Sequence, residues 1–278
     1  MITYKHEKFI EKAINSVLEQ QTDFDYELII ANDNSPDATH EIVKGIIKNH
    51  PKAYLIKYFN NPVNLGPNAN YIKAYNSGTG KYIAICEGDD YWGDNLKLQK
   101  QVDFLEENPE YVLTYHDVKY VDENGLSLRN FSKGKAKKEL KRIDLLKGKQ
   151  PLFLTTCYRK LPIDIPKEME NIINGDTFLT SILGNYGKGK WLDIKPAYYR
   201  YHSGGIWSLK EKEYKFKAKI QLFSVLKSHY RSQGLQDLED YFANQLFLYN
   251  KMLLMLYVKE KNYSGIKYAL KNYLYLKF

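Results

Sequence analysis

Cysteines, long apolar runs and a secretory leader are scarce or missing in this chain. Its 278 residues include only two cysteines, Cys86 and Cys157, too few for a disulfide framework or a cysteine metal site. No stretch of about 18 apolar residues occurs, so the sequence predicts no membrane-spanning helix. The N-terminal segment MITYKHEKFI has neither the apolar core nor the small-residue cleavage site of a secretory signal. These absences predict a cytoplasmic protein.

The composition is that of an ordinary globular protein, with 44% hydrophobic and 27% charged residues. Such a length fits one large α/β domain with a smaller appendage. The net charge of +8 is unevenly distributed, because the segment from Lys210 onward carries 13 Lys and Arg against six Asp and Glu. This asymmetry favours either an anionic partner surface, such as membrane phospholipid, or a solvated lysine-rich helical face. The remainder is nearly neutral, which argues against nucleic-acid binding.

Strand and helix patterns alternate along the first part of the chain. Strands are expected at 26–31, 54–59, 81–87, 111–122 and 191–201, and helices at 7–20, 42–47, 69–77 and 176–184. This alternation predicts an α/β fold with a doubly wound, mostly parallel sheet and helices on both faces. Beyond Ser208 we expect a helical extension of two or three helices, with breaks near Gly234 and Asn262.

Acidic residues follow two of the expected strands. Glu87, Asp89 and Asp90 come directly after the strand at 81–87, where the ligands of parallel sheets bind. Mg²⁺ and Mn²⁺ take carboxylate oxygens together with substrate phosphates, so the cluster predicts a site for one of these ions. The alternative is structural, since Asp90 or Asp94 could cap the helix expected to begin near residue 95.

Three segments in order, ITYKHEKFIEKAINSVLEQ, IIANDNSPDAT and NLGPNANYIKAYNSGTGKYIAICEGDDYW, resemble glycosyltransferase family 2, the inverting group with the GT-A fold. The resemblance covers about residues 1–207, which implies a catalytic domain there and a basic amphipathic extension at 208–278. It implies that Asp89 of EGDDYW is the principal metal ligand. Glu87, in place of the usual Asp, and Asp90 would contact the donor ribose or sugar, or hold metal-bound water.

The resemblance also implies a nucleotide pocket at the ends of the first two strands. Thr3 and Tyr4 match residues that line this pocket, and Lys5 stands where Asn is common. Asp33 matches the acidic residue that holds the donor base, although Asn32 replaces the Asp before it. An acceptor-only carboxylate suits the imide N–H of uracil. An Asx-turn or helix cap is the structural alternative for Asp33, and we expect no more than that of Asp37.

Two downstream segments complete the implied site. NGDTFL resembles the motif whose Asp is the general base, here Asp176, with Gly175 in place of the family's Glu. Without the family, a helix N-cap is the less favoured alternative for Asp176. In YYRYHSGGIW, His202 matches a His that reaches the metal or the diphosphate, and Gly204 and Gly205 would let the loop close over the donor. The first strand is expected to be short, because family members carry further apolar residues before the segment matching ITY.

The sequence therefore predicts an inverting, Mn²⁺- or Mg²⁺-dependent transferase that moves a sugar from a nucleotide-sugar donor, with UDP as the expected nucleotide, to a glycan or lipid-linked acceptor. A nucleotidyltransferase is disfavoured, because TYKHEKF is not a glycine-rich phosphate loop. A catalytically degenerate relative stays open, since Asn32, Glu87 and Gly175 depart from the usual pattern. The C-terminal stretches LFLYNKMLLMLYVK and IKYALKNYLYLKF predict helices that either bind an anionic membrane surface peripherally or pack on the catalytic domain.

Overall fold

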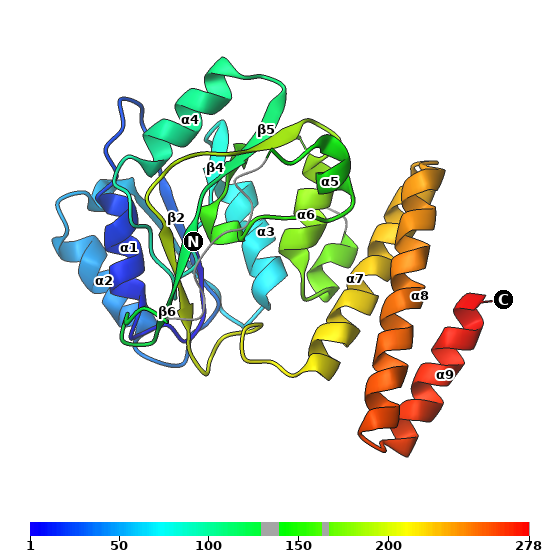
Figure 1. Cartoon of the computed structure of the whole chain (residues 1–278). Coiled ribbons are helices and arrows are strands. Elements are labelled where there is room, and N and C mark those ends of the chain that lie inside the picture. Colours follow the sequence, from blue (N-terminus) through cyan, green and yellow to red (C-terminus); the bar gives the residue numbers. More distant parts are fainter. Residues whose placement is uncertain (129–138, 163–166, 278) are drawn as a thin grey trace.

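The computed structural model describes residues 1–128, 139–162 and 167–277. Strands and helices alternate along most of this part of the chain (Figure 1). The strands are β1 (Ile2–Thr3), β2 (Leu28–Asn32), β3 (Ile56–Asn60), β4 (Tyr82–Ala84), β5 (Tyr111–Tyr115), β6 (Val118–Asp122), β7 (Cys157–Arg159), β8 (Lys188–Trp191) and β9 (Ala197–Tyr201). The helices are α1 (Ile10–Leu18), α2 (Thr39–Asn49), α3 (Pro67–Ser77), α4 (Lys97–Glu107), α5 (Arg142–Leu146), α6 (Gly175–Leu183), α7 (Lys212–Ser232), α8 (Gln236–Lys259) and α9 (Tyr263–Lys277), with the 3-10 helices η1 (Ala53–Leu55), η2 (Phe153–Thr155) and η3 (Lys167–Asn171).

The strands form three hydrogen-bonded groups. β1, β2 and β3 pair in parallel, in that order. In the second group the order is β4-β7-β5-β8, and β7 runs antiparallel to both neighbours, whereas β5 and β8 are parallel. The third group is the parallel pair β6 and β9. Helices flank these strands (Figure 1), so the predicted α/β fold with a mostly parallel sheet is confirmed.

Parallel pairing brings several strand ends to one edge. Thr3 lies opposite Asn32, and Asn32 lies opposite Asn60. The segment after β4 runs beside β1, because the backbone N–H of Gly88 donates to Ile2 O at 3.0 Å. The residues that follow β1, β2 and β4 therefore meet at the carboxyl edge of the sheet, the usual place of a ligand site in such folds.

Two expected strands are each interrupted. The strand predicted over 111–122 divides into β5 and β6, and the strand predicted over 191–201 divides into β8 and β9. The first break lies at residues 116–117 and the second at residues 192–196. Asp117 contacts both ends of the second break, because its carboxylate accepts a bond from Trp191 Nε1 at 3.0 Å and its carbonyl accepts one from Ala197 N at 3.2 Å. The chain passes there from one strand group to the next. Alternating apolar residues resume after each break, so the pattern alone does not reveal it.

The C-terminal helices pack against the α/β part. α7 and α8 form an antiparallel pair, and α7 lies beside α6 (Figure 1). Leu222 and Leu226 of α7 belong to the same buried cluster as Phe178 of α6, and the hydroxyls of Ser181 and Tyr230 are 2.8 Å apart. The breaks fall where expected: Gly234 has φ +69°, and α9 begins after Asn262. Within the described residues, no helix is long and apolar enough to cross a membrane.

Candidate functional site

The acidic segment after β4 lies directly against the end of β1. A Cβ at Gly88 would come within 2.6 Å of Thr3 Oγ1 and 2.8 Å of His6 Nδ1. Only a glycine permits this approach, because real Cβ atoms do not come so close to another atom. Gly88 thus lets Asp89 approach the residues that follow β1.

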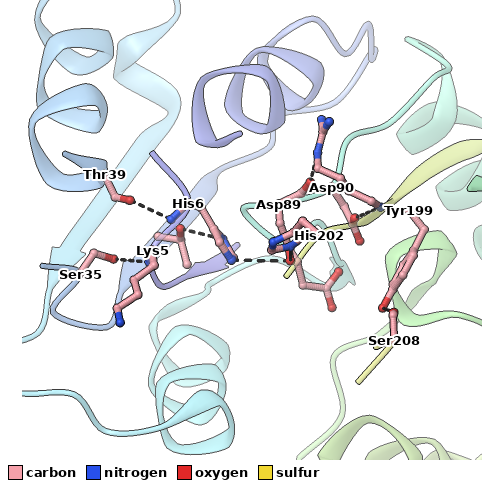
Figure 2. A network of polar contacts seen from close by, with 12 residues as sticks. Lys5, His6, Ser35, Thr39, Asp89, Asp90, Tyr199, His202 and Ser208 are labelled. Atoms are coloured by element: carbon pink, nitrogen blue, oxygen red, sulfur yellow. Dashed lines mark hydrogen bonds and ion pairs between the residues drawn. The ribbon is translucent and has the colours of Figure 1, made fainter. Parts of the chain in front are cut away.

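Asp89 lies between two histidines from distant parts of the chain (Figure 2). Its Oδ2 is 3.0 Å from Nε2 of His202, just after β9, and 3.6 Å from Nε2 of His6, just after β1. One ligand atom from each of the three side chains lies within 4.8 Å of the others. The structure therefore brings together the two predicted metal ligands, Asp89 and His202, and adds His6.

The protonation states of His6 and Asp89 suit a divalent cation. Burial lowers the pKa of the His6 imidazole, outweighing the opposite effect of Asp89, so His6 is neutral at neutral pH. Its Nδ1 lies 3.1 Å from Thr3 Oγ1, and a bond there leaves Nε2 free to face Asp89. Burial alone would raise the pKa of Asp89, but His6 and His202 lower it to about 2. An anionic carboxylate and neutral imidazole nitrogens are the forms in which these side chains bind metals.

Glu87 and Asp90 face different surroundings. The Asp90 carboxylate is 4% exposed and accepts the backbone N–H of Arg200 at 2.8 Å, so it joins the acidic segment to β9 and does not cap a helix. Glu87 keeps one buried oxygen, Oε2, without a partner among the described residues. Burial, followed by the charges of Asp89 and Asp176, raises the pKa of Glu87 to about 7. Asp94 takes the structural role, because it accepts the backbone N–H of Leu96 at 3.0 Å, just before α4.

Sequence reasoning missed His6 and Arg200. The Arg200 guanidinium donates from Nε to Asp89 O at 2.9 Å, and its own backbone N–H bonds Asp90; a buried cation thus holds the acidic segment. The signal for His6 was present, since it follows the strand-end residues Thr3 and Tyr4 in TYKHEKF. Arg200 offered no comparable signal, because nothing in YYRYH shows which side chain of that strand turns inward.

The predicted nucleotide pocket forms what we term the β1–β2 side of the site: the residues following β1 and β2, together with residues 61–66. Asp33 is 3% exposed, and its carboxylate accepts bonds from Asn61 Nδ2 at 3.0 Å, Leu65 N at 2.8 Å and Gly66 N at 2.9 Å. It therefore organises residues 61–66. Tyr4 is 39% exposed. Asp37 has the structural role expected of it, since it accepts the backbone N–H groups of Glu7 and Thr39.

Lys5 occupies a backbone conformation that explains why Asn is common at this position in the resembling family. Its φ is +60°, in the left-handed region that Gly and Asn adopt more easily than other residues. The turn is held by a bond from Lys5 N to Ser35 Oγ at 3.0 Å (Figure 2). The Asn common at this position in the resembling family suits the same turn, which directs His6 back toward Thr3.

Across the site, Asp176 lies in the first turn of α6. The N-cap position belongs to Asn174, so Asp176 is not the cap. Its Oδ2 accepts Gln150 Nε2 at 2.8 Å, and its Oδ1 accepts the backbone N–H of Thr177 at 2.7 Å. We term Gln150, the first turn of α6 with Asn174, and Lys219 of α7 the α6 side of the site.

Gly175 is also explained by its neighbour. A Cβ at this position would come within 2.3 Å of Asn68 Oδ1. The Asn68 side chain is fixed there by bonds from Nδ2 to the carbonyls of Met169, at 2.9 Å, and Ile172. Asn68 therefore occupies the space that a side chain at position 175 would need, which accounts for Gly in place of the family's Glu.

One cavity of about 1070 Å³ joins both sides. Its lining includes the predicted residues Thr3, Tyr4, Asp33, Glu87, Asp89, Asp90 and Asp176, and also His6. His202, 8% exposed, reaches the site through Asp89. The cavity thus combines a candidate metal group, a carboxylate in the first turn of a helix and the ends of two parallel strands, which is enough to bind a metal-complexed phosphate ester beside a proton acceptor.

The chain is similar to several known proteins. The family profile described as Glycosyl transferase family 2 matches residues 1–161. An uncharacterised protein of Mycobacterium tuberculosis is 34% identical over 211 residues, 74% of this chain and 59% of that protein. The chain thus spans about three fifths of that relative's length. A Campylobacter jejuni protein named GalNAc(5)-diNAcBac-PP-undecaprenol beta-1,3-glucosyltransferase is 34% identical over 90 residues, 32% of this chain and 28% of that protein.

The fold recurs in a solved structure. The mannosyltransferase PcManGT from Pyrobaculum calidifontis, in complex with GDP-Man and Mn²⁺, aligns with 98% of this chain and 84% of its own at a TM-score of 0.56. The sequence identity is 13%, so this likeness speaks to the fold alone.

Proposed function

The chain belongs to glycosyltransferase family 2, and from this premise we propose that it transfers a sugar, with inversion, from a nucleotide-diphosphate donor to a hydroxyl acceptor. UDP is the expected nucleotide. The observation that carries the proposal is the group His6–Asp89–His202 in a cavity that also contains Asp176. A catalytically inactive relative would not need an ionised carboxylate between two imidazoles in the same cavity as a candidate base.

The proposed reaction is a single displacement. The acceptor oxygen attacks the anomeric carbon of the donor sugar as the bond from that carbon to the diphosphate oxygen breaks. Asp176 takes the hydroxyl proton, and the electron pair of the broken bond leaves with the nucleoside diphosphate. Gln150 orients the Asp176 carboxylate through its 2.8 Å bond to Oδ2. Inversion follows, because base and leaving group act on opposite faces of the sugar.

We assign Asp89, His202 and His6 to the metal. A divalent ion there would neutralise the charge that develops on the departing diphosphate. Two imidazoles with one carboxylate favour Mn²⁺ over Mg²⁺, because Mg²⁺ prefers oxygen ligands alone. PcManGT, with the same fold, is described with Mn²⁺. Thr3 orients His6 through its 3.1 Å contact, and Arg200 holds the segment that carries Asp89.

The metal assignment is tested by calorimetry of UDP binding with and without Mn²⁺. Asp89→Ala should abolish the Mn²⁺-dependent part, and His6→Ala should weaken it by about 10- to 100-fold. Asp240→Ala, an exposed acidic residue of α8, is the matched control. A panel of UDP-, GDP- and TDP-sugars with Mn²⁺ then identifies the donor by transfer or hydrolysis. Unchanged metal-dependent affinity in a folded Asp89→Ala protein would refute the assignment, and no turnover of any donor would favour a degenerate binding protein.

The acceptor we propose is a glycan or a lipid-linked sugar, as in synthesis of surface polysaccharides; the name of the C. jejuni relative includes a lipid-linked substrate. Met255 and Val258 of α8 and Tyr263 and Tyr268 of α9 are exposed, among the lysines of this basic segment. We propose that this apolar face makes peripheral contact with an anionic membrane. Flotation with anionic and neutral liposomes at low salt tests it, and absence of the full chain from the anionic vesicles would refute it.

A further inference from the structure

Two amide oxygens on the α6 side lack partners. Gln150 Oε1 and Asn174 Oδ1 are buried and accept no hydrogen bond from any described residue. Both side chains line the cavity, and Asn174 is only 8% exposed. A buried acceptor without a donor is unfavourable, because it has lost its hydrogen bonds to water without replacement. A ligand that brings hydroxyl donors to this wall would remove that cost, so the wall is suited to a polyhydroxylated molecule.

Lys219 adds a positive charge beside these oxygens. It comes from α7, lines the cavity, and places Nζ 3.5 Å from Thr177 Oγ1, next to Asp176. Burial lowers its pKa, while Asp176 opposes that shift. Among the described residues, no carboxylate lies within ion-pair distance of Lys219, nor of Lys210, which also lines the cavity.

Lysine side chains of α7 meet Trp207 at the edge of the α6 side. Trp207 lies in the cavity wall, and its ring centre is 5.9 Å from Lys219 Nζ and 5.8 Å from Lys215 Nζ. Two lysines of α7 thus lie beside one indole ring, with Asp176 as a neighbouring acidic residue, whereas Glu87, Asp89 and Asp90 lie at the metal group. The donor diphosphate belongs to that group, since a metal there would bind it. The lysines of α7 are therefore available to bind a second anion.

We propose that the α6 side is an acceptor subsite for a polyhydroxylated acceptor that carries a phosphate-type anion next to the hydroxyl that reacts. Gln150 and Asn174 accept bonds from acceptor hydroxyls, Asp176 faces the reacting hydroxyl, and Lys219 binds the anion. The inference rests on the proposed function and names its acceptor class. The phosphate can belong to a polyol phosphate or to a polyprenyl-diphosphate-linked sugar, which share this chemistry.

The test compares matched acceptors with the donor found in the panel. Wild-type protein is assayed with a polyol phosphate, the same polyol without phosphate, and a polyprenyl-diphosphate-linked sugar. A charge-assisted contact predicts a preference in kcat/KM of about 10-fold or more for an anionic acceptor over the neutral one. Lys219→Met should remove this preference and leave the donor KM unchanged, whereas Lys219→Arg should retain it. Lys227→Met, on the same helix and outside the cavity lining, is the matched control.

Each outcome either supports or overturns the acceptor subsite. Loss of the preference in Lys219→Met but not in Lys227→Met supports the subsite, and the better anionic acceptor identifies the source of the phosphate. Equal use of charged and neutral acceptors by wild-type protein overturns it, as does donor hydrolysis with transfer to none of them. A raised donor KM in Lys219→Met with unchanged acceptor preference assigns the lysine to the donor and also overturns it. Metal-dependent donor binding, measured separately, shows whether the proposed function itself stands.

Discussion

The β1–β2 side and the α6 side of the cavity differ in how their polar groups are satisfied. On the β1–β2 side, the Asp33 carboxylate already accepts three bonds from the chain. On the α6 side, Gln150 and Asn174 each keep a buried oxygen that has no partner in the described parts of the chain. The first side is therefore complete before any ligand arrives, whereas the second is completed by one. Substitution of Asp33 on the first side should therefore act mainly on stability, whereas substitution of Asp176 on the second should act mainly on turnover.

The largest effect should come from Asp176→Asn. This change keeps the shape of the side chain but removes the base, so transfer should fall by about 10²–10⁴-fold while Mn²⁺-dependent donor binding survives. Single-turnover kinetics and calorimetry measure the two quantities. Asp193→Asn is the control, because Asp193 is an exposed carboxylate outside the cavity lining. Near-normal turnover in Asp176→Asn, with a loss in Asp193→Asn, would relocate the base.

Asp33→Asn tests the opposite side. An amide cannot accept from Leu65 N and Gly66 N at once without turning its own NH₂ toward one of them, so a buried donor loses its partner. We expect the free energy of unfolding to fall by about 2–4 kcal/mol, measured by urea denaturation. Asp25→Asn, at an exposed position, should change it little. If Asp33→Asn keeps full stability and loses only UDP affinity, the carboxylate binds the nucleotide directly. That result would contradict the view that the β1–β2 side is complete before a ligand binds.

Gly175→Ala should lower stability by a smaller amount, and Asn68→Ala should remove this loss. The new methyl group would displace Asn68 and weaken its bonds to Met169 and Ile172, costing about 1–3 kcal/mol of stability. In an Asn68→Ala background the clash is absent, so Gly175→Ala should then be nearly neutral. A double-mutant cycle by thermal denaturation measures this coupling. Additive effects would mean that the contact does not restrict position 175.

Lys5→Asn should give the smallest effect, and a favourable one. At φ +60° Asn is less strained than Lys, so the free energy of unfolding should rise by about 0.5–1 kcal/mol. Lys8→Asn, outside that turn, should bring no gain. A loss of stability in Lys5→Asn would show that the lysine side chain contributes more than the backbone turn costs.

Much of the β1–β2 side and of the metal group was predictable from the sequence. His202 was found only through the resemblance carried by YYRYHSGGIW. Polar residues at the ends of buried strands are recognisable, and such ends meet at one edge of a sheet, so the place of Asp89 beside the end of β1 could be expected. His6 obeys the same rule and was overlooked. Whether the Asp33 carboxylate was free or already bonded was not predictable, because its donors Leu65 N and Gly66 N are backbone groups without a sequence signature.

The α6 side was less accessible to prediction. Asp176 was found through a motif, but Lys219 lies in a lysine-rich stretch where no pattern distinguishes it from solvent-exposed neighbours. Its place in the cavity depends on how α7 docks on α6, and that docking is set by side-chain packing between distant segments. The two strand breaks, after Tyr115 and after Trp191, were missed for a similar reason, since they involve the contacts of Asp117 with Trp191 and Ala197 across the sheet.

The contact between Gly175 and Asn68 has a consequence for sequence divergence. Two positions more than a hundred residues apart share one small volume, so each restricts what the other can become. Among relatives, a bulky residue at 175 should coincide with a smaller residue at 68, and a lineage acquiring an acidic residue at 175 would have to lose the asparagine first. The order of substitutions at positions 68 and 175 therefore decides which form of the acidic motif a lineage can reach.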